Sequence, residues 1–451
     1  MTLVRAAPLL LALLTLPAVA DWDAEVGTDL TVIWPSYKWD PALGYAKDAL
    51  VPFRIESFDV ETSRFVIIYG EPSALAATDI LSGLPFHTAI SGDGNTLAYC
   101  LGAVPLSSDD CQLAVEKNTS EGSVLMGFLV DDVATFSHPY RFYLGDLKVN
   151  KSGNLVAAVN PLDDRIDGFF GRLDIWKLNE DGLYELAVSR INSSPGNAYQ
   201  PSLGEGLSVG TETVVVIENA AYTDGVDSRL LIYDIDEKQA SQEPSAELVL
   251  PEDTMGVPLR SRSTNAVFVS SNDQTISVMT EIAEGDQYYV RAHFFERAAE
   301  DRWVGKGAPI SVPILDTQIP IEDVAVGLSP DGNTAALLTY FYCADNEENS
   351  ISDCPLGALD LYDFDASAGQ WRRLEGGYLP ALLPNTDGAS AIRTEPPLLS
   401  DDGRSGYFVF DFATPPGGEY NGDFTSIGYE FRFEESSAQG LPIWLLYEAT
   451  Q

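Results

Sequence analysis

The stretch "LSPDGNTAALLTYFYC", from Leu328 to Cys343, decides the fold, and "ISGDGNTLAYC", from Ile90 to Cys100, repeats its first half. In both stretches an apolar residue precedes a turn that ends in Asp-Gly-Asn-Thr, and a run of mainly apolar residues follows. Glycine and asparagine accept the positive φ angle that a two-residue hairpin turn requires. Each stretch therefore predicts two antiparallel strands joined by a tight turn.

Looser copies of this phrase occur between and after the two clear ones. They share an alternating apolar run, a short polar or glycine-containing turn and a second apolar run, and they span Leu147 to Val159, Leu203 to Glu218, Val267 to Thr280 and Pro396 to Phe410. A second kind of run follows most copies, with alternating residues and an aromatic side chain, as in "SRLLIYDIDEK" from Ser228. This alternation is typical of half-buried strands.

Together these runs predict units of about 60 residues with four strands each, and helical periodicity is almost absent. Evenly spaced strands with a recurring turn motif are typical of a β-propeller. The sequence therefore predicts an all-β, seven-bladed β-propeller, with units that begin near Asp23, Pro85, Gly145, Ala198, Arg260, Ile321 and Thr394. The first unit is irregular, so six blades with an N-terminal closing segment is the alternative.

The segment "GLSPDGNTAALLTY", which ends at Tyr340, resembles the Ser-Pro-Asp-Gly opening of WD-repeat-like propeller units, the kind found in the periplasmic propeller of the Tol system. As a pattern the resemblance extends over most of the chain, but only Leu328 to Tyr340 carries the full motif. The resemblance implies a propeller fold. It implies little about function, because such repeats occur both in binding modules and in accessory domains of enzymes.

The first twenty residues have the composition of a secretory signal. They combine Arg5, an apolar run from Leu9 to Leu16, and small residues at Ala18 and Ala20. We expect cleavage after Ala20, a single propeller domain over residues 21–451, and a secreted or periplasmic location. The apolar run is shorter than the roughly 20 residues that span a bilayer, so we expect no membrane span.

The chain is strongly acidic, with 68 Asp and Glu residues against 26 Lys and Arg residues, which gives a formal net charge of −42. Such a surface repels nucleic acid and anionic lipid, so neither is expected as a partner. The simplest explanation is an acidic coat suited to a salty environment.

The acidic coat leads to a prediction about salt. Salt screens repulsion between exposed charges over about 10 Å at 0.1 M ionic strength. We therefore expect the melting temperature to rise as NaCl is added, which differential scanning calorimetry would measure. A melting temperature that stays flat from low to high salt would contradict this explanation of the charge.

The four cysteines form two pairs with equal spacing. Cys100 and Cys111 follow one copy of the Asp-Gly-Asn-Thr phrase, and Cys343 and Cys354 follow the other. We expect two local disulfides at corresponding places in two units, in an oxidising compartment. A metal site is the alternative, but the spacing is not that of a zinc ribbon.

Acidic loops are the candidates for metal binding, and Ca²⁺ is the one cofactor considered. They lie at Pro161 to Gly168, Thr223 to Arg229 and Glu419 to Phe424, but none has the spacing of a known calcium loop, so no metal ligand is assigned. Glycosylation sequons occur at Asn118, Asn150 and Asn192, and they matter only in a eukaryotic source.

Catalytic motifs are weak. "GLSVG" places Ser208 in a Gly-x-Ser-x-Gly pattern, but the residues that follow predict a strand where a nucleophile elbow requires a helix. The histidines are His87, His138 and His293, no two of which have a chelating spacing. We expect His293 to be a packed or surface strand residue, and we assign no catalytic residue.

The entry to the first strand of each unit should face the mouth of a central channel. Aligning the units places there a set of polar residues, namely His87, Asp146, Gln200, Arg262, Asp323 and Glu395. Pre-formed depressions lined by such groups are the usual ligand sites. We therefore expect a binding or scaffolding module whose partner is a protein, a small molecule or a carbohydrate. The alternative is a carboxylate-dependent glycosidase or lyase that works in the channel.

Overall fold

The structure is a computed structural model of the chain. It describes residues 31–35, 39–40, 45–46, 53–59, 64–69, 85–91, 96–102, 110–119, 122–128, 140–141, 146–160, 172–191, 203–218, 229–235, 243–250, 257–258, 267–284, 287–299, 302–313, 321–341, 357–378, 390–394, 396–400, 403–413, 424–432 and 443–448. The expected signal segment, residues 1–20, lies outside these ranges.

Within the described ranges the elements are antiparallel strands, which form seven sheets of three or more strands and one two-stranded pair. We number the larger sheets 1 to 7 in chain order. Sheet 1 contains β1 (Thr31–Pro35), β4 (Phe53–Asp59) and β5 (Arg64–Tyr69), and the pair is β2 (Trp39–Asp40) with β3 (Tyr45–Ala46). Sheet 2 contains β6 (Pro85–Ile90), β7 (Thr96–Gly102), β8 (Asp110–Thr119), β9 (Gly122–Phe128) and β10 (Tyr140–Arg141).

Sheets 3 and 4 are regular four-stranded meanders, in which each strand pairs with the next one in the chain. Sheet 3 contains β11 (Asp146–Val149), β12 (Leu155–Asn160), β13 (Arg172–Leu178) and β14 (Tyr184–Ile191). Sheet 4 contains β15 (Leu203–Val209), β16 (Thr213–Glu218), β17 (Arg229–Asp234) and β18 (Ala246–Val249).

Sheets 5, 6 and 7 follow the same plan, with the first strand divided in two in sheets 5 and 7 and the last strand divided in two in sheet 5. Sheet 5 contains β19 (Val257–Pro258), β20 (Val267–Val269), β21 (Thr275–Glu284), β22 (Gln287–Ala299), β23 (Arg302–Gly305) and β24 (Ile310–Pro313). Sheet 6 contains β25 (Ile321–Leu328), β26 (Thr334–Phe341), β27 (Gly357–Asp365) and β28 (Gln370–Tyr378). Sheet 7 contains β29 (Ser390–Thr394), β30 (Leu398–Leu399), β31 (Ser405–Ala413), β32 (Phe424–Arg432) and β33 (Ile443–Glu448).

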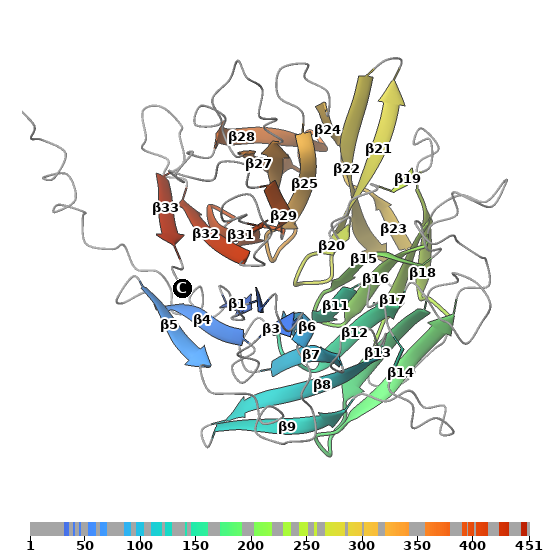
Figure 1. Cartoon of the computed structure of the whole chain (residues 1–451). Coiled ribbons are helices and arrows are strands. Elements are labelled where there is room, and N and C mark those ends of the chain that lie inside the picture. Colours follow the sequence, from blue (N-terminus) through green and yellow to red (C-terminus); the bar gives the residue numbers. More distant parts are fainter. Residues whose placement is uncertain are drawn as a thin grey trace, which may run out of the picture.

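The first strand of each sheet lies next to the first strand of the following sheet. These contacts run from β1 to β6, β11, β15, β20, β25 and then β29 and β30. Figure 1 shows the sheets in chain order around a common centre, with their first strands innermost. This arrangement is a β-propeller, as the sequence predicts. Seven blades, rather than six with a closing segment, stays a prediction, because sheet 1 has three described strands.

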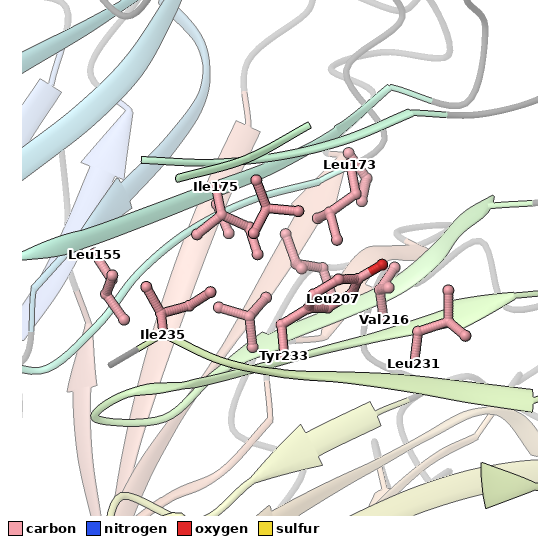
Figure 2. Packing of buried hydrophobic residues seen from close by; sticks show 12 residues of the cluster. Leu155, Leu173, Ile175, Leu207, Val216, Leu231, Tyr233 and Ile235 are labelled. Atoms are coloured by element: carbon pink, nitrogen blue, oxygen red, sulfur yellow. The ribbon is translucent and has the colours of Figure 1, made fainter. Parts of the chain in front are cut away.

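The core lies between successive sheets. Figure 2 shows one such layer, in which Ile175 of sheet 3 lies near Leu207, Val216 and Tyr233 of sheet 4. Further clusters join sheets 2 and 3, sheets 4 and 5, and sheets 5 and 6. Because a sheet within the ring has a neighbour on each side, both of its faces become apolar, and every residue of β16 is buried. Burying each large aliphatic side chain contributes about 1.5 to 3 kcal/mol.

The part of the chain that the structure describes contains no helix long and apolar enough to cross a membrane.

Candidate functional site

The repeated phrase forms the turn between the first and second strands of a sheet. In sheet 6 the Ser329 hydroxyl accepts a hydrogen bond from the Thr334 amide at 2.9 Å and donates one to Asp331 Oδ1 at 2.6 Å. Asp331 also accepts from the Asn333 amide at 2.9 Å. Partial burial favours the neutral acid, but these hydrogen bonds outweigh it and lower the pKa of Asp331. Gly332 adopts the positive φ of 70° that closes the turn.

The same closure recurs in other sheets. Ser91 and Ser270 each accept a hydrogen bond at 2.9 Å from the amide of the threonine five residues later. In sheet 3 an asparagine takes the place of the serine, and Asn150 Oδ1 accepts from the Leu155 amide at 3.0 Å. Asn150 is 1% exposed, and its Nδ2 donates to Thr211 O at 2.7 Å. The sequon at Asn150 is therefore closed to glycosylation in the folded chain.

Successive turns also contact one another. The Cα of Gly153 lies against Thr96 of the preceding turn, and the Cα of Gly332 lies against Thr275 in the same way. In sheet 5 the glycine is replaced by Asp273, which has a φ of 59°. Its carboxylate accepts hydrogen bonds from the Thr211 and Glu212 amides of sheet 4, each at 2.9 Å. Burial raises the pKa of Asp273, although these backbone hydrogen bonds oppose the rise. We call this end of the sheets the turn end, and its described turns interlock.

The opposite end of the first strands, which we call the entry end, is irregular. In sheet 2 Phe86 pairs with Cys100 and Thr88 with Tyr99, so His87 has no partner in the ladder. In sheet 4 residues 204–206 lie opposite Ile217 alone. In sheet 5 the first strand is divided into β19 and β20, which pair with β21 through Pro258 and Thr280 and through Val267 and Val278. Such bulges bend a strand and are over-represented next to functional sites.

The bulges of sheets 2 and 4 occur at one level. Counted back from the first residue of the tight turn, which is Ser91 in sheet 2 and Gly210 in sheet 4, the first unpaired residue lies four positions earlier, at His87 and Gly206. Sheet 6 has its bulge nearer the entry, at Glu322. The first strands of sheets 2, 4 and 6 are thus interrupted on the entry side and pair again beyond the bulge, whereas β11 of sheet 3 pairs without interruption.

The structure describes three of the six residues expected at the channel mouth. His87 is the bulged residue of β6, Asp146 is the first residue of β11, and Asp323 pairs with Tyr340 directly beside the bulge. The other three, Gln200, Arg262 and Glu395, lie outside the described residues, so their placement at the mouth stays a prediction. Glu322 was missed, because strand alternation alone does not reveal a bulge.

The two residues considered for catalysis have structural partners. Ser208 lies in β15, and its hydroxyl accepts a hydrogen bond from the Val269 amide of sheet 5 at 3.0 Å. Its strand setting differs from the strand-to-helix turn of a nucleophile elbow. His293 is 8% exposed in β22, and its Nε2 lies 3.0 Å from Thr280 Oγ1. The prediction of a packed strand histidine is confirmed.

The cysteines are partly placed. Cys100 pairs with Leu113 and Cys111 pairs with Gly102, so the two cysteines are diagonal neighbours across β7 and β8. This disulfide stays a prediction. Cys343 and Cys354 lie outside the described residues, so the disulfide between them also stays a prediction.

Among the residues that the structure describes, no group of three or more His, Cys, Asp or Glu residues is arranged to hold a metal ion. The acidic loops considered for Ca²⁺ lie outside these residues, apart from Arg229 and Phe424 at their ends.

The fold resembles that of several solved structures. A functionally unknown protein from Desulfotomaculum acetoxidans matches with a TM-score of 0.44 and 10% identity over 90% of this chain and 98% of its own. An oligogalacturonate lyase from Vibrio parahaemolyticus matches with 0.44 and 10% over 85% and 84%. The β-propeller domain of the trilobed protease from Pyrococcus furiosus matches with 0.39 and 10% over 82% and 94%.

Comparison with protein-family models gives no match, and comparison with curated proteins gives none either. The structural similarities are too distant to carry an argument about function. A functional proposal therefore depends on the geometry of this chain.

Proposed function

We propose that this chain is a secreted or periplasmic acidic β-propeller that binds a protein, small-molecule or carbohydrate ligand at the entry end of its channel. The observation that supports this is the set of bulges that interrupt the first strands of sheets 2, 4 and 6 toward the entry end. At the turn end neighbouring described turns contact one another, whereas the entry side departs from regular pairing at His87, at residues 204–206 and at Glu322.

The secretory signal and the acidic coat support an extracytoplasmic location, and the resemblance to Tol-system repeats agrees with a periplasmic one. Two disulfides would add to the stability of the ring in that compartment. The acidic surface also bears on the ligand, because an anionic protein attracts cationic groups and repels anionic ones.

The test is a binding screen with matched variants. The mature chain, residues 21–451, is screened against an oligosaccharide array and a displayed peptide library, and affinities of the ligands found are measured by titration. We expect the double variant His87→Ala/Asp323→Ala to weaken binding at least about tenfold, because two lost polar contacts cost more than 1.4 kcal/mol.

Glu180→Ala is the control, because it also removes a carboxylate and lies in the exposed turn after β13, at the turn end. Equal affinity for the double variant and the wild type would contradict the entry-end site. Conversion of a bound oligosaccharide into shorter products would favour the glycosidase or lyase alternative.

A further inference from the structure

The segment between β23 and β24 remains at the edge of sheet 5, where the Lys306 amide donates to Phe294 O of β22 at 2.7 Å, and its side chains reach sheet 6. Lys306, the first residue of this segment, is one of only eight lysines in the chain, yet it is 4% exposed. Lysine is rarely buried to this extent without a partner that takes its charge. The surroundings of this side chain therefore require an explanation.

The ammonium group of Lys306 has three hydrogen-bond acceptors, which equals the number of its protons. It donates to Gly332 O at 2.7 Å, to Asn333 Oδ1 at 2.9 Å and to Thr275 Oγ1 at 3.1 Å. The first two acceptors belong to the tight turn of sheet 6, and the third opens the second strand of sheet 5. All three are neutral, so the site recognises an ammonium group by the number and direction of its donors.

Two aromatic rings of sheet 6 complete the site. Lys306 Nζ lies 5.0 Å from the ring centroid of Phe364 and 5.7 Å from that of Trp371, within the range of cation–π attraction. Trp371 Nε1 also donates to Lys306 O at 2.8 Å, which fixes the main chain beside the ammonium group. Burial lowers the pKa of Lys306, while the charges of Glu296 and Asp331 partly offset this.

We infer that sheets 5 and 6 together form a binding site for a primary ammonium group, that the chain fills this site with its own Lys306, and that this locks the two sheets together. A primary ammonium group satisfies all three acceptors. A quaternary ammonium group has no N–H to donate to them, and a guanidinium group has a planar set of donors that does not match.

The experiment empties the site and refills it. Lys306→Ala in the full mature chain removes Cγ, Cδ, Cε and Nζ, which together have the structure of n-propylammonium. We expect the melting temperature to fall by about 5 °C, because three charge-assisted hydrogen bonds are lost. Adding n-propylammonium chloride should restore most of this loss, because a ligand that binds only the folded state stabilises it.

Three measurements make the test specific. NaCl and tetramethylammonium chloride at equal ionic strength control for salt screening, and Lys306→Met keeps most of the stem while it removes the charge. We expect the Met variant to melt below the wild type and to gain no more from n-propylammonium than from NaCl. If the Ala variant does not fold alone, refolding in n-propylammonium chloride should recover it. Rescue no better than with NaCl, or a Met variant as stable as the wild type, would overturn the inference.

Discussion

Replacing Gly332 with alanine is expected to lower the free energy of unfolding by about 3 to 5 kcal/mol, as overpacking at a left-handed position combines two costs. Gly332 has a φ of 70°, a conformation that residues with a Cβ adopt at a cost. A Cβ at this position would also lie 2.2 Å from Oγ1 and 2.5 Å from Cβ of Thr275. Thr275 is 1% exposed and holds Lys306, so it has no room to move.

Gly369 offers a matched control for this prediction. It also has a positive φ, of 62°, but a Cβ there would meet nothing within 4 Å. Gly369→Ala therefore isolates the backbone strain, and we expect it to cost about 1 to 2 kcal/mol. Denaturant unfolding of both variants measures the difference. If both variants lose the same stability, the contact between the turns of sheets 5 and 6 contributes nothing measurable.

The hairpins were predictable from the sequence because each turn is local. The six residues from Ser329 to Thr334 contain the serine cap, the positive φ and the start of the second strand. The contact between Gly332 and Thr275 joins residues of two different units, and nothing within one copy of the phrase indicates it. Asp273 shows the same limit, because its turn lacks the expected glycine and only the neighbouring sheet explains the substitution.

The candidate site was predictable only in outline. Aligning the units predicts His87 and Asp323 at the entry to the first strands, whereas the structure has each as the third residue of its strand, and their role at a channel mouth stays a prediction. Strand alternation fits the residues before and after a bulge equally well, so the unpaired positions at His87 and Glu322 depend on the partner strand. The buried lysine at Lys306 was not anticipated, because its acceptors come from two sheets that the sequence does not visibly connect.

Replacing Arg172, whose charged side chain is buried, should also lower the free energy of unfolding strongly. Arg172 and Asp174 have side chains only 2% and 3% exposed, and Arg172 Nε lies 2.7 Å from Asp174 Oδ2. Arg172 NH2 also donates to Ser189 Oγ at 3.1 Å. Arg172→Met removes the cation of this buried ion pair, and we expect a loss of about 3 to 5 kcal/mol in unfolding free energy.

Two further variants separate charge from packing. Arg373 also pairs with a carboxylate, that of Asp360 at 2.6 Å, but its side chain is 58% exposed, so Arg373→Met should cost less than about 1 kcal/mol. The double variant Arg172→Met/Asp174→Leu removes both buried charges and should regain most of the stability that Arg172→Met loses. Denaturant unfolding of the four proteins, wild type included, measures these differences. If the double variant is no more stable than Arg172→Met, the loss comes from the packing of the arginine side chain and not from the loss of the buried ion pair.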